Sequence, residues 1–443
     1  MPKKKTALTI EERLQQALVP AEEQPYEVPE NWVWVRLIGN VNSCLDGYRK
    51  PINSSERAKR VGKVPYYGAT GQVGWIDDYL TNEHLVLLGE DGAPFLDLLK
   101  DKAYIIFGEA WVNNHAHILK SYFGEIGNVF LMHYLNMVDY KDYVKGTTRL
   151  KLTQGSMQLM PFPLPPFSEQ QRIVERIEEL FSKLDEAKER LQEVVDSFAV
   201  RKAAILHKAF TGELTKQWRR ENGVSDESWE DVSLDSVCKS IYDGDHMPPP
   251  KSETGIPFLV ISNVNTGFIS FEKCRFVPEE YYDGLSETRT PEIGDILYTI
   301  VGSYGIPVMV DTDKKFCFQR HMALLKPKDI YNRFLWRQLQ TQSFFEQATS
   351  IATGTAQLTV PIKGLRKLIV KCPTLPEQHE IVRLIDDLLA RERAAQQATE
   401  QALASIDLMK KSILARAFRG ELGTNKASEA SALELLRQVL AEN

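Results

Sequence analysis

The second half of this 443-residue chain repeats the first half at a nearly fixed distance. The segment Gly146-Thr147-Thr148-Arg149-Leu150 returns about 208 residues later as Gly354-Thr355-Ala356-Gln357-Leu358. Three further segments return at the same offset: Glu169-Gln170 as Glu377-Gln378, Ile205-Leu206 as Ile413-Leu414, and Gly212-Glu213-Leu214 as Gly420-Glu421-Leu422. Such a repeat predicts two similar units related by a pseudo-twofold axis. Duplex DNA has the same symmetry, so the duplication also points to a possible binding partner.

The composition is that of an ordinary globular protein with two to four domains, at 43% hydrophobic and 26% charged residues. The cysteines are odd in number and form no Cys-x-x-Cys: Cys44, Cys238, Cys274, Cys317 and Cys372. This pattern predicts a reducing cytoplasm rather than a disulfide framework or a structural zinc site. No apolar run is long enough to span a membrane, and the start Met1-Pro2-Lys3-Lys4-Lys5 lacks the apolar stretch of a signal peptide.

A net charge of −6 is not typical of a simple nucleic-acid binder, but one segment is strongly basic. Residues 49–63 carry six basic side chains against Glu56 alone, a local net charge of +5. The six are Arg49, Lys50, Arg57, Lys59, Arg60 and Lys63. This loop is a candidate phosphate-binding surface.

Two segments of about 45 residues have the apolar spacing of coiled-coil helices. The first seam consists of Ile173, Ile177, Leu180, Leu184, Ala187, Leu191, Val194, Phe198 and Ile205. The second consists of Ile381, Ile385, Leu388, Ala395, Ala402, Ile406, Met409 and Ile413, with Glu392 and Thr399 interrupting it. Each helix would be roughly 65 Å long at 1.5 Å per residue. Because they hold equivalent places in a duplicated chain, we expect them to pack antiparallel against each other rather than form separate stalks.

A region of roughly 120 residues, rich in short strand-like runs, precedes each helix. The two copies match more loosely than the helices do. We pair Trp32 with Trp229, Gly74-Trp75-Ile76 with Gly267-Phe268-Ile269, Gly89-x-x-Gly92 with Gly302-x-x-Gly305, and His115 with His321. Loops tolerate insertions that packed helices do not, so the helices are expected to be the shared frame and the two domains the variable parts.

The expected architecture is therefore mixed α/β, with two pseudo-symmetric globular domains joined by two long antiparallel coiled-coil helices. The expected boundaries are an N-terminal segment with a short helix (1–28), a first domain (29–148), a first helical region (149–214), a linker (215–228), a second domain (229–356), a second helical region (357–424) and a tail helix (425–443).

The sequence lacks the motifs of the enzymes that act on nucleic acids. There is no phosphate-binding G-x-x-x-x-G-K-[ST]. The nearest match to a base-holding methyltransferase tetrapeptide is Leu164-Pro165-Pro166-Phe167, in which leucine cannot accept a hydrogen bond from an amine. Asp313-Lys314-Lys315 is only part of a nuclease signature. His115-x-His117 has no further ligand at metal spacing, which favours a hydrogen-bonded or surface pair. The two Gly-x-x-Gly pairs are expected to be strand turns.

The order and duplication of these motifs resemble the specificity subunit of type I restriction-modification systems. The resemblance covers residues 25–424. It is carried by Trp32 and Trp229, by Tyr66-Tyr67-Gly68-Ala69-Thr70-Gly71, and by Gly294-Asp295-Ile296-Leu297 before Gly302-Ser303-Tyr304-Gly305. The most specific signals are Glu-Gln-x-x-Ile-Val at the start of each helix, within Pro166 to Val174 and within Leu375-Pro376-Glu377-Gln378 to Val382, and Phe-x-Gly-Glu-Leu at its end.

The resemblance implies a non-catalytic DNA-binding subunit that serves bacterial defence in the cytoplasm. In that family each domain recognises one half of a bipartite, asymmetric DNA target, and the helix pair sets the distance between the halves. Two methyltransferase subunits and two motor-nuclease subunits are the implied partners. Their S-adenosylmethionine and ATP would be bound by those subunits, so this chain is expected to bind no cofactor and no metal.

Polar side chains on turns are the candidate contacts to DNA. In the first domain these are Arg49, Lys50, Arg57, Lys59, Arg60 and Lys63 for phosphates, with Tyr67, Thr70 and Gln72 near the groove. In the second they are Asn263, Asn265, Thr266, Ser303, Tyr304 and Arg320. Arg149, with Thr147, and the equivalent Thr355 and Gln357 either contact DNA or only cap structure.

Two alternatives remain open on the sequence. The chain could serve a modification-only methyltransferase complex without a nuclease, or it could be a coiled-coil scaffold with two protein-binding heads. If the first helix sets the spacing, one helical turn inserted near Leu214 is expected to lengthen the gap between half-sites.

Overall fold

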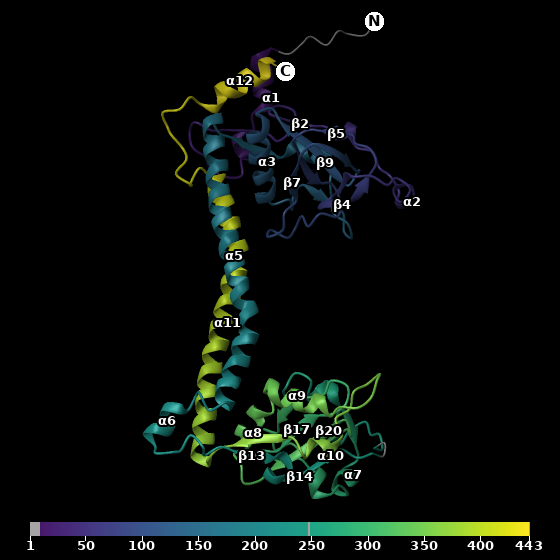
Figure 1. Ribbon diagram of the computed structural model, residues 1–443. Coiled ribbons are helices and arrows are strands. Elements are labelled where there is room, and N and C mark those ends of the chain that lie inside the picture. The colour runs from purple at the N-terminus through teal and green to yellow at the C-terminus, as the bar shows by residue number, and fades with distance from the viewer. Residues whose placement is uncertain (1–8, 247–248, 443) are drawn as a thin grey trace. The chain divides into compact units, whose positions relative to one another are not determined.

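The computed structural model describes residues 9–246 and 249–442, so the basic start at Lys3-Lys4-Lys5 lies outside the described residues. The chain divides into two compact units. Unit 1 comprises Met1–Gln192 and Gln401–Asn443, and unit 2 comprises Glu193–Glu400 (Figure 1). Each unit therefore contains one globular domain, part of helix α5 (Phe167–Phe210) and part of helix α11 (Leu375–Ala417). None of the described helices combines the length and the apolar character that crossing a membrane requires.

The domain of unit 1 contains two four-stranded sheets. The first is antiparallel and has the order β2-β9-β6-β7, and the second has the order β4-β3-β8-β5 with β3 and β8 parallel. Their strands are β2 (Asn42–Cys44), β3 (Val64–Gly68), β4 (Gly71–Ile76), β5 (Thr81–Asn82), β6 (Leu85–Gly89), β7 (Ala103–Ile106), β8 (Glu109–Val112) and β9 (Ala116–Ser121). Helix α3 (Gly124–Met137) packs on the first sheet. Short helices α2 (Ser54–Arg57) and α4 (Gln154–Leu159) and the hairpin of β10 (Val144–Lys145) and β11 (Lys151–Leu152) complete the domain.

The domain of unit 2 has the same topology. Its first sheet has the order β14-β20-β17-β18, and its second has the order β16-β15-β19 with β15 and β19 parallel. The strands are β14 (Cys238–Asp243), β15 (Ile256–Leu259), β16 (Arg275–Val277), β17 (Ile296–Thr299), β18 (Pro307–Met309), β19 (Cys317–Phe318) and β20 (Met322–Pro327). The helices are α6 (Lys216–Glu221), α7 (Glu279–Asp283), α8 (Asn332–Gln338), α9 (Gln342–Ser350) and α10 (Ile362–Leu365). The mixed α/β fold and the duplication expected from the sequence are confirmed.

The strand registers correct two of the pairings made from the sequence. An isolated bridge joins Asp91 to Lys151 in unit 1, and its counterpart joins Val301 to Thr359 in unit 2. The equivalent of Gly302 is therefore Gly92, and the pairing of Gly302 with Gly89 is wrong by three residues. Gly92 and Gly302 both have positive φ, at 72° and 69°, as expected of turns that follow a strand.

The second correction concerns Trp75. Trp75 lies opposite Pro65 in β3–β4, whereas the residue opposite the equivalent Pro257 is Phe276, not Phe268. A two-residue turn joins β3 to β4, between Gly68 and Gly71, but residues 260–274 separate β15 from β16. Unit 2 thus has an inserted loop here, which accounts for the changing offset between the two copies.

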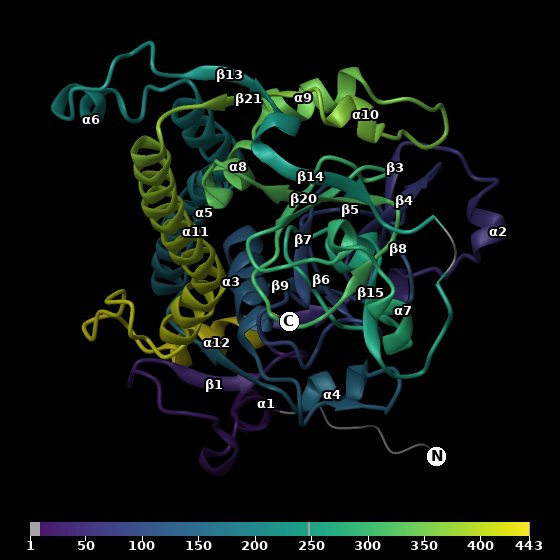
Figure 2. The ribbon, with the colours of Figure 1, turned by 90° about the horizontal axis from the view of Figure 1, so that it is seen from below.

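A two-stranded antiparallel ribbon precedes each long helix. It pairs β1 (Val33–Arg36) with β12 (Pro161–Leu164) in unit 1, and β13 (Glu230–Ser233) with β21 (Ile369–Cys372) in unit 2. Figure 2 shows β13 and β21 side by side. The glutamate at the start of each helix is fully buried: Glu169 accepts a hydrogen bond from Trp32 Nε1 at 2.7 Å, and Glu377 pairs with Arg219 at 2.8 Å. These contacts explain why Glu-Gln recurs in the sequence.

Helices α5 and α11 run antiparallel within each unit. In unit 1 Lys188 pairs with Asp407 at 3.2 Å and Asp185 with Lys410 at 2.6 Å. In unit 2 Arg201 pairs with Glu392 at 2.9 Å, so the polar interruption of the second seam is an ion pair. The 44 residues of α5 and 43 of α11 agree with the predicted lengths.

Three seam positions predicted from the sequence are wrong. Val194, Ala395 and Met409 are exposed, while the neighbouring Val195 and Gln396 are half-buried. The packed face moves by one residue after Leu191, because 3.6 residues per turn drift away from a strict heptad.

The first and last described helices meet in unit 1. Helix α12 (Ala432–Glu442) packs on α1 (Ile10–Ala17), and Leu436 and Leu440 of α12 enter the same core as Leu14. This agrees with terminal helices that brace the end of the helix pair.

Candidate nucleic-acid interface

The basic loop of unit 1 is held against the second sheet, and two of its six basic side chains are used internally. Arg49 is ion-paired with Glu90 and, at 2.9 Å, with Asp46. Arg60 pairs with Asp77 at 2.6 Å and lies over the ring of Trp111. Arg49 is therefore engaged within the domain, because its guanidinium neutralises Asp46 and the buried Glu90, which lies 41 residues away in sequence. Its contact with phosphate stays a prediction.

The other four basic residues of the loop have no ion pair within the described part of the chain. Arg57 stacks over Tyr66, with its guanidinium 4.9 Å from the ring centroid, which leaves the edge of the guanidinium available. Lys50, Lys59 and Lys63 are exposed. The loop thus presents four positively charged side chains, one of which is stacked on an aromatic ring.

Thr70 and Gln72 lie at the exposed tip of the β3–β4 hairpin. Tyr67 is half-buried, with its ring 5.9 Å from that of Tyr104, so it supports the hairpin rather than projecting from it. A Cβ on Gly89 would lie 3.0 Å from the carbonyl oxygen of Ala69, which places the tip beside the turn after β6. The structure therefore brings Thr70 to the same edge of the domain as Arg149.

Arg149 lies in the loop between β10 and β11 and is 59% exposed. Asp91 Oδ1 accepts hydrogen bonds from Arg149 Nη2 and His115 Nδ1, both at 2.7 Å. The carboxylate fixes the guanidinium while leaving most of it accessible. The sequence did not indicate Asp91 or its contact with His115, since 24 residues separate the two and no motif joins them.

A buried ionic cluster lies beneath this edge. Both ring nitrogens of His117 face acceptors: Nδ1 lies 2.6 Å from Asp46 Oδ2 and Nε2 lies 2.9 Å from Leu152 O. Both ring nitrogens are therefore engaged, one by a carboxylate and one by a backbone carbonyl. The guanidinium of Arg49 pairs with both Asp46 and Glu90.

Cys44, Asp46 and His117 approach one another closely enough to suggest a metal site, which the sequence did not indicate. Three observations argue against one. Burial raises the pKa of the Cys44 thiol to about 12, so the thiolate ligand is disfavoured. Both His117 nitrogens are engaged, and the guanidinium of Arg49 already lies against Asp46. The arrangement fits an ion-pair network.

We expect this network to stabilise unit 1 at neutral pH and to fail in acid. Burial alone would raise the pKa of Asp46, but hydrogen bonds from His117 and the Ile118 amide and the charge of Arg49 hold it below its usual value. A carboxyl whose folded pKa lies below the unfolded value of about 4 contributes stability above that pH and loses it as the pH falls. Asp46→Asn should therefore cost about 2 kcal/mol at pH 7, measured by urea unfolding. The difference from wild type should shrink below about pH 4, and a difference that stays constant down to pH 3 would contradict this account.

The residues of unit 2 that were predicted to contact DNA fall into two groups: some hold the loops in shape and others are accessible to a ligand. Asn263 is buried: its Oδ1 accepts from the Val260 amide at 3.0 Å and its Nδ2 donates to Glu272 O at 3.1 Å. The Asn263 side chain thus shapes the inserted loop, and its contact with DNA stays a prediction. Asn265 and Thr266 of that loop are exposed.

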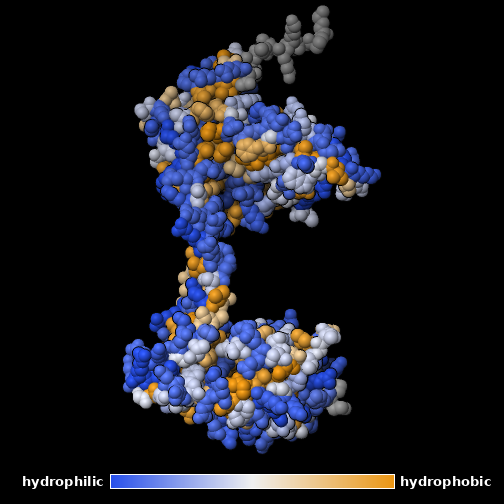
Figure 3. Space-filling model, in the orientation of Figure 1, coloured by the Kyte–Doolittle hydropathy of each residue, from blue (hydrophilic) through white to orange (hydrophobic). Residues whose placement is uncertain are grey.

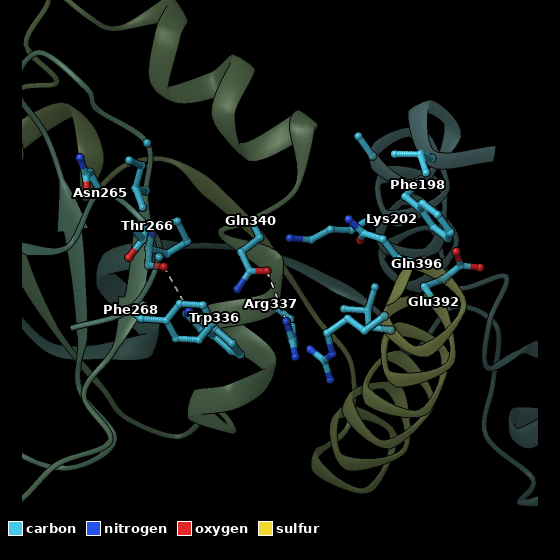
Figure 4. Close-up of a pocket in the computed structure, with 18 residues that line it drawn as sticks. Phe198, Lys202, Asn265, Thr266, Phe268, Trp336, Arg337, Gln340, Glu392 and Gln396 are labelled. Atoms are coloured by element: carbon cyan, nitrogen blue, oxygen red, sulfur yellow. Dashed lines mark hydrogen bonds between the residues drawn. The ribbon is translucent and has the colours of Figure 1, made fainter. Parts of the chain in front are cut away.

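Asn265 and Thr266 lie at the edge of a cavity of about 700 Å³ within unit 2 (Figure 4). The loop provides one wall, α8 provides Trp336 and Arg337, and the long helices provide Lys202 and Arg393. Burial, with the nearby charges of Arg337 and Arg393, lowers the pKa of Lys202. Phe268, 69% exposed, lies at the same edge, and the sequence did not indicate Lys202, Trp336, Arg337 or Arg393.

The remaining candidates of unit 2 lie on turns. Ser303 and Arg320 are exposed. Tyr304 stacks on Phe345 with 5.4 Å between ring centroids and donates to Thr349 Oγ1 at 3.0 Å, so its ring and hydroxyl are both engaged. Tyr304 is better placed to hold the turn than to contact a ligand.

Comparison with known proteins places this architecture in a family. The model of the type I restriction modification DNA specificity domain matches twice, over residues 29–196 and 226–403. The chain belongs to this family. The two matches begin next to the tryptophans that start each domain and run well into each long helix. The sequence resemblance is confirmed, and the chain is a DNA-recognition subunit of the type I kind.

Individual members of the family agree with this assignment. The chain is 28% identical over 314 residues to the EcoBI specificity subunit of Escherichia coli, covering 66% of each chain. It is 25% identical over 440 residues to the EcoDI specificity subunit of Escherichia coli, covering 94% of this chain and 96% of that one. The crystal structure of the HsdS subunit from Thermoanaerobacter tengcongensis shares the fold, with a TM-score of 0.59 at 19% identity over 90% of this chain and all of that one.

Proposed function

We propose that this chain is a non-catalytic specificity subunit that recognises a bipartite, asymmetric DNA target and positions methyltransferase and motor-nuclease subunits on it. The observation that carries the proposal is the double match of the DNA specificity domain, one copy in each unit. Two domains of one topology but different surface loops suit two different half-sites. The cytoplasm is the compartment in which such a complex meets DNA.

We assign phosphate contacts in unit 1 to Lys50, Arg57, Lys59 and Lys63, with Thr70, Gln72 and Arg149 towards the bases. In unit 2 the assigned contacts are Asn265, Thr266, Ser303 and Arg320. All of these except Arg57 are exposed, and Arg57 presents its edge from the face of Tyr66. The supporting role of Arg60, Tyr67 and Tyr304 is to hold these loops in place.

Unit 1 also exposes apolar side chains that fit assembly with other subunits. Leu98, Leu99 and Phe107 are each about half exposed or more, and hydrophobic colour gathers over α3 and β7 in Figure 3. Contiguous apolar surface of this kind is common at protein interfaces.

The test is to reconstitute the chain with the methyltransferase subunits of its own genome and to map methylated adenines on a random-site library. We expect a motif of two defined half-sites separated by a gap of fixed length. Methylation at one uninterrupted motif would refute the bipartite proposal. Sequence-insensitive binding would favour the scaffold alternative. If the assembled complex failed to bind an added motor-nuclease subunit, a modification-only complex would be favoured.

Three lysines of the basic loop should supply affinity without specificity. We expect the triple variant K50Q/K59Q/K63Q to weaken DNA binding by the assembled complex, because each lysine releases about one counterion from a phosphate. A plot of log affinity against log salt should become less steep by about 3, as measured by fluorescence anisotropy.

The matched control is K100Q/K183Q/K188Q, which removes three lysines that are each paired with a carboxylate. It should leave the salt dependence unchanged. An unaltered slope in the loop variant, or a changed half-site sequence, would contradict the assignment of these lysines to phosphates.

A further inference from the structure

The cavity of about 700 Å³ in unit 2 has a smaller counterpart, of about 310 Å³, in unit 1. Each lies between the domain and the long helices of its unit. In unit 1, His133 of α3 pairs with Glu178 of α5 at 2.7 Å. In unit 2, Arg337 of α8 pairs at 2.7 Å with Asp386 of α11, which is the repeat of Glu178. The two cavities therefore hold equivalent places, and their linings can be compared position by position.

One lysine is common to both cavities, but only unit 1 supplies its counter-ion. Lys410 forms an ion pair with Asp185 at 2.6 Å across the helix pair. In unit 2 the repeat of Lys410 is Lys202. The repeat of Asp185, however, is Arg393. Unit 2 thus has a second cation where unit 1 has the partner of the first.

The formal charges of the two linings differ accordingly. The lining of unit 1 contains two cations and two acids, a formal charge of zero with neutral histidine: Lys410, Lys411, Asp101 and Asp407. The lining of unit 2 contains three cations and one acid, a formal charge of +2: Lys202, Arg337, Arg393 and Glu392. The unit 2 cavity is positive where its counterpart is neutral.

The acids near the unit 2 cavity are already engaged. Glu392 pairs with Arg201 at 2.9 Å. Asp386 pairs with both Arg333 and Arg337, each at 2.7 Å, so one carboxylate serves two guanidinium groups. The lining therefore has no carboxylate left for a further cation.

The remaining cations share the cavity without a counter-ion. Lys202 and Arg393 are accessible to solvent and form no ion pair in the part of the chain that the structure describes. Figure 4 shows Lys202 extending from α5 into the space in front of α8. Its partial burial there, followed by the charges of Arg337 and Arg393, lowers the pKa of Lys202. Arg337 is only 8% exposed, and its Nε has no hydrogen-bond partner among the described residues. An anion in the cavity would remove the repulsion between these groups.

We infer that the cavity of unit 2 is a binding site for the phosphate group of a ligand, and that its counterpart in unit 1 is not. Two guanidinium groups and one ammonium group supply the charge-assisted donors that phosphate oxygens accept best. Gln340, Gln396 and Asn265 add neutral amide donors to the same lining. A volume of about 700 Å³ is typical of ligand sites and far exceeds a bare ion, so the phosphate belongs to a larger molecule.

Two sources of such a phosphate fit the cavity. One is the DNA backbone, because Asn265 and Thr266 at its edge are assigned to DNA and would bring a strand to the opening. For this source the inference rests on the proposed function, and it gives unit 2 the phosphate contacts that the basic loop gives unit 1. The other source is a free nucleotide, whose base would stack against Trp336 or Phe268 and whose binding requires no recognition of DNA.

The test exchanges one residue for its repeat in unit 1. Arg393→Asp introduces the aspartate that unit 1 has here, so that Lys202 gains an internal partner. It should weaken pyrophosphate binding roughly tenfold, because a charge-assisted contact is lost. Isothermal titration calorimetry measures this on the full-length chain in its methyltransferase complex, or on the full-length chain alone if no complex forms.

Two further variants separate the loss of the site from other effects of a new carboxylate. Lys202→Gln, on the other long helix, should reduce pyrophosphate binding to a comparable extent. The matched control is Lys363→Asp, which makes the same change in charge at an exposed lysine of α10 outside the cavity. Its pyrophosphate affinity should equal that of the wild type.

The source of the phosphate is identified by two more measurements. If it is DNA, Arg393→Asp should weaken binding of the target duplex roughly tenfold. A neutral methylphosphonate in place of one backbone phosphate beside the half-site of unit 2 should then weaken binding by the wild type but not by the variant. If it is a free nucleotide, ATP should compete with pyrophosphate on the wild type, and the variant should bind DNA as the wild type does.

Equal affinities of the wild type and Arg393→Asp for pyrophosphate, ATP and DNA would overturn the inference. So would a variant that loses only its methyltransferase subunits, because acidic side chains of that partner would then be the occupant of the cavity. A complex that keeps the difference in pyrophosphate binding but methylates a single uninterrupted motif would refute the proposed function and leave the phosphate site standing.

Discussion

Glu377→Ala should lower the free energy of unfolding of unit 2 by about 3 kcal/mol and leave unit 1 unchanged. The Glu377 side chain is fully buried and accepts hydrogen bonds from Arg219 Nη1 at 2.8 Å and Thr215 Oγ1 at 2.6 Å. Removing one partner of a buried ion pair costs about 3–5 kcal/mol, because the remaining charge stays buried without compensation. We expect the lower end of this energy range for Glu377→Ala, because Arg219 keeps its ion pair with Asp226 at 3.0 Å.

The effect is best measured by hydrogen exchange, which reports on each unit separately. Peptides from β14, β17 and β20 should exchange faster in Glu377→Ala, and peptides from β6 and β9 should serve as an internal standard. Replacing both partners, as in E377L/R219M, should recover much of the stability, because apolar residues of similar volume leave no orphaned charge. A double variant as unstable as the single one would show that the site is important for its shape rather than its charge.

The matching position in unit 1 should behave differently. Glu169 accepts from Trp32 Nε1, from Asn425 Nδ2 at 2.8 Å and from Thr424 Oγ1 at 3.3 Å, all of which are neutral donors. In unit 2 the equivalent tryptophan nitrogen, Trp229 Nε1, and Glu377 Oε2 are both buried without a partner among the residues that the structure describes. The two copies therefore keep one glutamate at the helix start but surround it with different donors.

This site shows what sequence reasoning reached and what it missed. The repeated Glu-Gln marked the start of each helix, because helix registers tolerate no insertion and their offset is constant. The residues that bind the glutamates follow the opposite helix, Thr215 and Arg219 in one unit and Thr424 in the other. Residues 215–228, predicted to be a polar linker, in fact supply the buried Arg219. Contacts between segments 158 residues apart leave no periodic signal.

For the candidate DNA surface, too, the sequence indicated the segment but not the contacts that its side chains make. Charge density located the basic loop correctly, since charge is a local property of the sequence. It could not distinguish Arg49, whose partner Glu90 lies in another strand, from Lys50, which is exposed. Nor could the sequence show that the Asn263 amide is hydrogen-bonded within its own loop, because an asparagine that shapes a turn and one that reads a base have the same sequence context.

The length of the helix pair should set the distance between the two half-sites, but an insertion that tests this has to be made at a different place from the one that the sequence suggested. Helix α5 ends at Phe210, so residues inserted near Leu214 would lie beyond the helix and would not lengthen it. We instead expect a longer gap when seven residues are inserted into α5 between Gln192 and Glu193 and seven into α11 between Glu400 and Gln401. Seven residues add about 10.5 Å of helix at 1.5 Å per residue, close to three base pairs at roughly 3.4 Å each.

Both insertions are required because the helices are antiparallel. Each step forward along α5 is matched by a step back along α11, from Asp185–Lys410 and Lys188–Asp407 in unit 1 to Arg201–Glu392 in unit 2. Seven residues return the packed face to nearly the same side of each helix, so the paired insertion keeps the seam. An insertion in α5 alone would displace its ion pairs from their partners and should impair assembly without giving a new, defined gap.

The outcome is read from methylated sites in a host that carries each variant. The paired insertion should add about three base pairs between the half-sites and leave both half-site sequences intact, because neither domain has been altered. An unchanged gap would mean that something other than these helices sets the distance, such as the bound partner subunits. A change in either half-site would mean that the domains do not read DNA independently of the helices, and the division into frame and reading domains would then have to be abandoned.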